Sequence, residues 1–520
     1  MDTISDHPEH IEGISFRKLA RGGAFFFFGT ICAMGLQFVV SIVVIRAIKR
    51  PEFGLISLTN IFVNMVVMLA VLGFSNGLPR LMAMYRQKNE ENSVRIIIGT
   101  AMVIVLISGL LWALILLLVS PWLAECFNKP GIQNVLRAFV LTVPPLVLIN
   151  TLTAIFRGTE NTYPKVIFED ISLNLCRILL LLPVVFLGMG FQGVIWIYVG
   201  SAWISCAAYI LYAKNKPVFK KLFFFSRPMA NNLLLFSLPL LGIAIMGNLV
   251  NWTGTLTVGY LQSADQVALY SAPLRLASLI PLPLTALIFL YLPMATKLFE
   301  EASLKKLKVL YTNTTKLAFF ITMPILLFFF IDADFIVVHL FGKPYQDSAN
   351  ILRILLVGFS VHIFLGPNGV TLISMGNTRI LFHITMTSCL SAIILCITLV
   401  PIYGGMGAAA GISLSRIISN LIVSTVLYKR FNIHPFNWSY IKPTAFSFIL
   451  SLLFYWLFSP TNHFNMILHS IMLLFIISTV LMSPIITHSL NSSDIAFISS
   501  IEQRIWNRTI LAKYISYGLK

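Results

Sequence analysis

About fourteen apolar runs, each close to the length that crosses a bilayer, constrain this chain more than any other feature of its sequence. A membrane-spanning helix needs roughly 20 consecutive apolar residues, and polar breaks separate the runs. They lie at about 22–45, 55–77, 96–119, 135–156, 165–188, 191–213, 233–259, 274–296, 313–336, 350–373, 380–400, 405–428, 443–459 and 464–487. We therefore predict an all-α integral membrane protein with about fourteen transmembrane helices.

The composition favours the same class, because 58% of the residues are hydrophobic and only 11% are charged. The mean hydropathy of +0.87 is far from that of a soluble globular domain. The six cysteines show neither a disulfide framework nor the spacing of a zinc site. We expect no metal and no cofactor.

The basic residues predict the topology of the chain. If the amino terminus is cytoplasmic, 27 of the 37 Lys and Arg residues fall in inside loops or termini. Eight fall outside, namely Arg46, Lys49, Arg50, Lys129, Arg137, Arg275, Lys343 and Arg353. Because cytoplasmic loops carry an excess of positive charge, both termini are predicted to be cytoplasmic. The net charge of +18 then requires no nucleic acid, although a basic inner face would attract anionic membrane lipids.

An internal repeat predicts two lobes. FNKP at 127–130 recurs as FGKP at 341–344, and NVLR at 134–137 recurs as NILR at 350–353, at offsets of about 214 to 216. Ordered matches at one spacing indicate duplication, and six spans per copy place both copies in parallel. We predict an N-terminal six-helix lobe at 1–220, a C-terminal six-helix lobe at 221–435 and two further transmembrane helices at 436–490. Residues 491–520 would form a cytoplasmic amphipathic tail or, equally, a frayed end.

Two arginines remain inside predicted spans, and they are the leading site candidates. Arg177 shares one helical face with Asp170 and Asn174, and Arg416 lies in a span without acidic residues. A charge at this depth is costly and usually faces a cavity or a partner. Two guanidinium groups suit a diphosphate. The alternative for Arg177 is a fixed ion pair with Asp170 or with Glu169.

Neutral polar residues in the spans could bind sugar hydroxyls or could simply pack helices together. They include Asn60 and Asn64, Asn150, and Asn248 with Asn251. Arg46, near the outer end of the first span, either lines the outer mouth for an anion or is merely tolerated there. Asp332-Ala333-Asp334 matches a metal-binding pattern of glycosyltransferases, but the short outer loops and the absence of a phosphate-binding loop favour a protein that is not an enzyme.

Five motifs spread along the chain carry a family resemblance. They are Arg50-Pro51-Glu52-Phe53-Gly54, Phe236-Ser237-Leu238-Pro239, Tyr270-Ser271-Ala272 with Arg275, Leu340-Phe341-Gly342 with Tyr345 and Ala349, and 401–409 (PIYGGMGAA). Together they resemble the polysaccharide-transporter, or O-antigen flippase, family of the multidrug/oligosaccharidyl-lipid/polysaccharide exporter superfamily. The resemblance implies a multi-pass protein of the plasma (inner) membrane that moves a polyprenyl-diphosphate oligosaccharide to the outer leaflet by alternating access. It also implies that Arg177 and Arg416 hold the diphosphate, with a glycan polymerase or ligase as a candidate partner.

Two other interpretations stay open. Many relatives carry an acidic residue in the span at 233–259, where residues 252–257 of this chain are neutral, so the resemblance leaves ion coupling undecided. A cation-coupled multidrug exporter of the same superfamily is the main alternative, and a scaffold without transport is the third.

Overall fold

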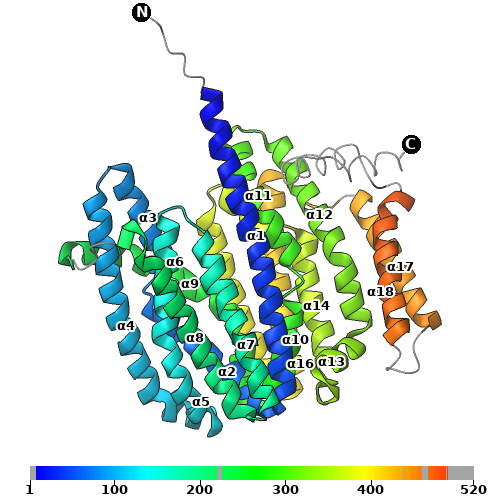
Figure 1. The fold of residues 1–520 in the computed structure, drawn as a ribbon. Helices are drawn as coiled ribbons and strands as arrows, with labels where there is room; N and C mark the ends of the chain where they lie inside the picture. The colour runs from blue at the N-terminus through cyan, green and yellow to red at the C-terminus, as the bar shows by residue number, and fades with distance from the viewer. Residues whose placement is uncertain (1–7, 220–224, 437, 459–465, 488, 490–520) are drawn as a thin grey trace, which may run out of the picture.

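The computed structural model describes residues 8–219, 225–436, 438–458, 466–487 and 489, and every regular element in these ranges is helical (Figure 1). The predicted amphipathic tail at 491–520 lies outside the described residues. The first half of the chain forms α1 (Pro8–Ala47), α2 (Arg50–Ala70), α3 (Phe74–Gln87), α4 (Glu91–Cys126), α5 (Gly131–Phe139), η1 (Val140–Thr142), α6 (Val143–Gly158), η2 (Lys165–Ser172), α7 (Leu173–Phe186), α8 (Gly190–Lys214) and η3 (Pro217–Phe219).

The second half forms a similar series of helices that ends in a pair at one side of the bundle (Figure 1). It comprises α9 (Arg227–Leu261), α10 (Ala264–Ala277), α11 (Leu282–Glu300), α12 (Leu304–Ile331), α13 (Ala333–Phe341), η4 (Lys343–Tyr345), α14 (Ser348–Leu365), α15 (Asn368–Ser374), α16 (Thr378–Phe431), α17 (Trp438–Phe458) and α18 (Met466–Ile486). The first described residues of α1 and the last of α18 lie at the same end of the bundle (Figure 1).

The prediction of an all-α membrane fold is confirmed. Eleven helices in the described ranges are long and apolar enough to cross a membrane. Large apolar side chains also face outward, among them Phe186 at 86% exposed and Leu235 at 74%, as expected where lipid replaces water. The exact count of fourteen spans stays a prediction.

One of the eleven helices contributes two of the predicted spans. The backbone of α16 leaves the helical conformation at Gly404, where φ is 55° and ψ is −130°. A positive φ of this kind is available to glycine without steric cost. The chain therefore reverses, and the two halves pack on each other, with the Ser415 hydroxyl donating to the Ser388 carbonyl oxygen at 2.6 Å.

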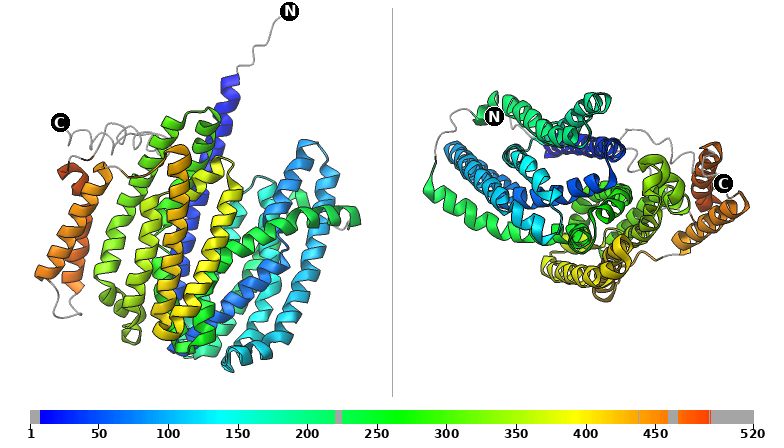
Figure 2. Two further views of the ribbon diagram at one scale, coloured as in Figure 1. Left: turned by 180° about the vertical axis from the view of Figure 1, so that it is seen from behind. Right: turned by 90° about the horizontal axis from the view of Figure 1, so that it is seen from below.

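The spacing of the predicted repeat recurs in the boundaries of the helices. α9 ends and α10 begins 214 residues after α1 ends and α2 begins. α2 and α10 pack closely against each other at the end of the bundle where they begin. The division into lobes at 220 and 435 stays a prediction, since α9 contacts α2, α3 and α4 of the first half as well as α16 of the second (Figure 2).

A buried polar contact attaches the last helix to the rest of the bundle. His469 of α18 and Asp332 at the start of α13 are 2% and 4% exposed, and the imidazole Nδ1 lies 2.8 Å from the carboxylate Oδ2. The Phe335 ring stacks on His469 at 3.6 Å between centroids. Asp334 pairs with Arg353 at 2.6 Å. Both carboxylates of the Asp332-Ala333-Asp334 pattern therefore bind side chains of this protein.

Replacing His469 with alanine is expected to destabilise the protein, because Asp332 would keep a buried carboxylate without its partner. An unsatisfied buried group costs about 1–3 kcal/mol. The variant should therefore unfold at a lower temperature than wild type in detergent, as followed by tryptophan fluorescence. The exposed His383 provides a control, and equal unfolding temperatures for His469→Ala and His383→Ala would contradict a stabilising role for the pair.

Candidate functional site

Arg177 is held against aromatic and hydroxyl groups rather than against a carboxylate. It lies on α7, one turn beyond η2, whose backbone is a π-helix. Its guanidinium carbon is 4.6 Å from the centre of the Tyr198 ring, and its Nε donates to the Ser201 hydroxyl at 3.4 Å. Asp170 instead lies 3.9 Å from Lys165. Among the described residues Arg177 forms an ion pair with neither Asp170 nor Glu169, so the alternative of a fixed ion pair is wrong there. The charge of Arg177 remains available to an anion.

Asp170 and Asn174 share a helical face as predicted. The Asn174 amide nitrogen donates to the Asp170 carbonyl oxygen at 2.7 Å, so this contact lies within the helix. Among the described residues, Glu169 Oε2, Asp170 Oδ2 and Asn174 Oδ1 are buried without a hydrogen-bond donor. Buried acceptors of this kind are uncommon and require an explanation. This face of η2 and α7 thus offers oxygen atoms to a ligand that donates hydrogen bonds or carries positive charge.

Arg275 is a third interior arginine, and the assignment of this residue to an outer loop was wrong. α10 is a buried helix, and Arg275 sits near its end with its guanidinium carbon 5.2 Å from the centre of the Phe53 ring. One of its nitrogens donates to the Ser41 hydroxyl of α1. Arg275 and Arg177 lie near each other, so the interior holds two neighbouring guanidinium groups. α10 is too short to cross the bilayer by itself, so hydropathy does not identify it as a span. Hydropathy therefore places Arg275 at the start of the next apolar run rather than in the interior.

Arg416 faces the interior from the second half of α16. Its guanidinium carbon lies 4.0 Å from the centre of the Phe359 ring, and its Nη2 donates to the Asn251 side-chain oxygen of α9 at 3.1 Å. One turn further along α16, the Asn420 amide contacts His362 at 2.9 Å. Aromatic and amide groups therefore hold the guanidinium, and no carboxylate neutralises it among the described residues.

Arg46 connects distant segments of the chain at the end of the bundle where α2 and α10 begin. Its Nε donates to the Leu340 carbonyl oxygen at 3.0 Å, and its Nη2 donates to the His339 carbonyl oxygen. Nearby, Arg50 pairs with Asp265 at 3.0 Å. Arg46 therefore joins the end of α1 to α13, and Arg50 joins the start of α2 to α10 and to the Pro344 carbonyl oxygen of η4. Whether Arg46 also binds substrate stays a prediction.

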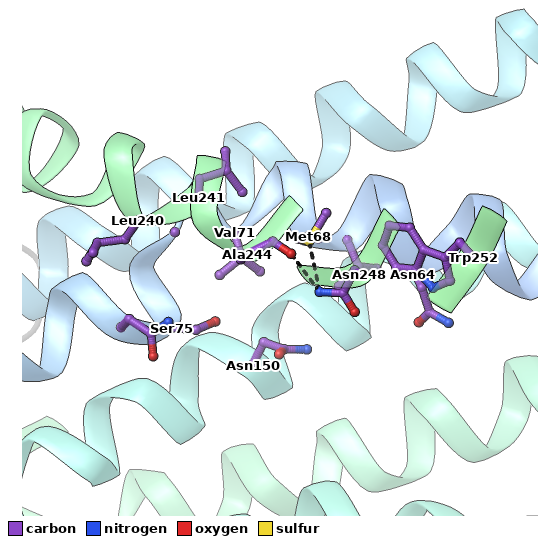
Figure 3. Close-up of a pocket in the computed structure, with 13 residues that line it drawn as sticks. Asn64, Met68, Val71, Ser75, Asn150, Leu240, Leu241, Ala244, Asn248 and Trp252 are labelled. Carbon is purple, nitrogen blue, oxygen red and sulfur yellow. Dashed lines mark hydrogen bonds between the residues drawn. The ribbon is translucent and has the colours of Figure 1, made fainter. Parts of the chain in front are cut away.

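Asn64 lines a cavity of about 300 Å³ between α2, α3, α6 and α9 (Figure 3). Asn150 reaches the same cavity from α6, and Asn248 and Trp252 reach it from α9 (Figure 3). Asn60 lies one turn before Asn64 but outside the lining, and its amide nitrogen donates to the Ile56 carbonyl oxygen at 3.0 Å. The structure thus assembles neutral polar side chains that the sequence could only name separately.

The predicted site residues fall into three places along the interior. Arg177, Asp170 and Asn174 lie on η2 and α7, and Asn64 lies in the cavity. α9 connects that cavity with Arg416, because its Asn248 lines the cavity and its Asn251 binds the guanidinium. An interior whose arginines have no carboxylate partner in the part of the chain that the structure describes, with neutral amides nearby, is suited to a ligand that combines an anion with uncharged polar groups.

Residues 43–350 match the family model described as polysaccharide biosynthesis protein. A putative O-antigen transporter of Shigella flexneri is 23% identical over 410 residues, which cover 74% of this chain and 91% of that protein.

Two solved structures share the fold. The lipid II flippase MurJ in an inward closed conformation is 14% identical with a TM-score of 0.72, and the match covers 89% of this chain and 99% of that protein. An inward-facing multidrug resistance MATE family transporter of the MOP superfamily is 15% identical with a TM-score of 0.65, and the match covers 77% of this chain and 94% of that one. At these identities the structures establish a common fold, and all of these similar proteins are named as transporters or flippases.

Proposed function

The chain belongs to the polysaccharide biosynthesis protein family and has the fold of a MOP-superfamily transporter, and from this we propose that it flips a polyprenyl-diphosphate-linked oligosaccharide from the cytoplasmic to the outer leaflet. The observation that carries the proposal is that Arg177 and Arg416 have no carboxylate partner among the described residues, and that α9 links Arg416 to a cavity lined by neutral amides. The names of the putative O-antigen transporter and the lipid II flippase support the same substrate class.

In this proposal Arg177 and Arg416 bind the diphosphate. A guanidinium stays charged at any cellular pH and offers planar pairs of donors that match phosphate oxygens. Stacking on Tyr198 and Phe359 holds the two groups in place before substrate arrives. Access would switch when one half of the bundle rocks against the other, as in transporters built from repeats. The contacts of Arg46 and Arg50 would then close the outer side and break when it opens.

The remaining parts of the proposal follow from the topology. We place the protein in the plasma (inner) membrane with both termini cytoplasmic, because the basic residues favour that orientation. The oligosaccharide-bearing lipid is the substrate, and a glycan polymerase or ligase on the outer side would receive the product. No chemical step is assigned to the chain.

A flipping assay tests this function. Purified wild type is reconstituted in liposomes with a fluorescent polyprenyl-diphosphate saccharide, and a membrane-impermeant quencher reports the fraction of lipid in the outer leaflet. We expect rapid exchange with the protein and slow exchange in empty liposomes. If folded protein, inserted in the liposome membrane in either orientation, leaves the lipid in its original leaflet, the result would contradict the proposal.

Cation-coupled drug export is the second candidate, and one observation favours it. Glu169 Oε2 and Asn174 Oδ1, which are buried without a hydrogen-bond donor among the described residues, are suited to a proton, a metal cation or a cationic ligand. The same liposomes, loaded with a cationic dye and given a pH or sodium gradient, test this directly. Dye movement without lipid flipping would replace our proposal with the exporter.

A further inference from the structure

The cavity between α2, α3, α6 and α9 has a lining without charge. Its polar side chains are four asparagines and one serine (Figure 3). The other lining residues are apolar, and one of them, Trp252, is aromatic. A charged ligand group here would lose its hydration without gaining a counter-charge, which is costly. An uncharged group that both donates and accepts hydrogen bonds would meet matching partners.

The amides that line the cavity are held in fixed orientations. The amide nitrogen of Asn150 donates to the Leu146 carbonyl oxygen at 2.9 Å. That of Asn248 donates to the Ala244 carbonyl oxygen at 2.9 Å and contacts Met68 sulfur at 3.7 Å (Figure 3). A carboxamide carries two donors and one acceptor group, so Asn150 still has its oxygen and a second N–H to offer, and Asn248 still has its oxygen. A sugar hydroxyl needs this combination of donor and acceptor.

Trp252 supplies an apolar surface at one end of the cavity, beside Asn64 (Figure 3). A pyranose ring has one face of C–H groups with hydroxyls around its edge, so it can stack on an aromatic ring while its hydroxyls bind amides. A volume of about 300 Å³ is at the small end of ligand sites, which suits one or two sugar residues rather than a whole oligosaccharide.

The position of the cavity along α9 links it to the charged part of the interior. Asn248 and Trp252 face the cavity, while Asn251 between them binds Arg416 at 3.1 Å. A diphosphate at Arg416 would therefore leave its first sugar within reach of the cavity. We propose that this cavity is a subsite for an uncharged sugar residue next to the diphosphate of the substrate, so that the chain selects neutral over acidic first sugars.

This inference rests on the proposed flippase function, and its test separates the two. Three fluorescent polyprenyl diphosphates are compared in liposomes: one without sugar, one with N-acetylglucosamine and one with glucuronic acid. The double variant Asn150→Leu, Asn248→Leu removes both amides with little change in volume. Each lost hydrogen bond is worth about 1 kcal/mol, so flipping of the N-acetylglucosamine lipid should fall about tenfold or more. Flipping of the sugarless lipid should stay within about twofold of wild type.

Matched controls and a direct binding measurement complete the test. Asn134→Leu, at an exposed amide of α5, should leave all three lipids unchanged. Saturation-transfer NMR with free N-acetylglucosamine disaccharide and purified protein should show contact that the double variant and Trp252→Leu lose. Equal slowing of the sugarless and N-acetylglucosamine lipids, equal flipping of neutral and acidic lipids by wild type, or unchanged NMR contact in the variants would overturn the subsite. Wild type that binds the disaccharide but flips no lipid would overturn the proposed function alone.

Discussion

The double variant Arg177→Ala, Arg416→Ala is expected to lose flipping of polyprenyl-diphosphate saccharides. Each guanidinium would make charged hydrogen bonds with the diphosphate, and such bonds are worth about 1.5–3 kcal/mol each. Losing both should reduce the flipping rate at limiting substrate by roughly 10²- to 10⁴-fold. The quencher assay in liposomes measures this rate, and each single variant should fall between wild type and the double variant.

The controls separate charge from geometry. Arg177→Lys and Arg416→Lys keep the charge but lose the planar donor pair, so they should retain part of the activity. Arg137 is exposed on α5, and Arg137→Ala should flip at the wild-type rate. Folding is checked by size-exclusion chromatography and unfolding temperature. Normal flipping by the folded double variant would make both arginines structural, with stacking on Tyr198 and Phe359 as their only role.

The arginine candidates show what the sequence could and could not predict. Arg177 and Arg416 stand out because each interrupts a long apolar run, which hydropathy detects directly. Arg275 lies between two apolar stretches and therefore reads as a loop residue. Only packing reveals it as interior, since α10 is buried against α2 and its arginine reaches Ser41 of α1.

The asparagines illustrate the same limit for the cavity. The sequence identifies Asn60 and Asn64 as equal candidates because they lie one turn apart on α2. Asn64 lines the cavity, whereas Asn60 does not. The difference depends on where α9 crosses the first half of the bundle, a contact between segments nearly 200 residues apart (Figure 2). Sequence periodicity predicts which residues share a helical face. Which other helix packs against that face depends on the tertiary structure.

Gly54 is the residue whose replacement should have the second large effect. It lies where α2 meets α10, and an added Cβ would be 1.9 Å from the Ala264 carbonyl oxygen and 3.3 Å from the Ala268 nitrogen. The obstacle is backbone, so no side-chain rotation can relieve it. Gly54 and Ala268 are also 214 residues apart, the spacing of the repeat, so equivalent positions of the two halves touch each other here. Small residues allow this close approach of helices.

Gly54→Ala is therefore expected to disfavour closure of the outer side and to slow flipping. Overpacking costs about 1–3 kcal/mol, which corresponds to roughly a ten- to hundredfold shift toward the state with α2 and α10 apart. Ser57, one turn further along α2, is 6% exposed and provides a reporter. With native cysteines replaced by alanine, a Ser57→Cys side chain should react faster with a membrane-impermeant maleimide when Gly54→Ala is present. Gly35 has no atom within 4 Å of its added Cβ, so Gly35→Ala should change neither flipping nor labelling. Slow flipping with unchanged labelling would mean that α2 and α10 stay together throughout transport, and the rocking motion would have to occur elsewhere.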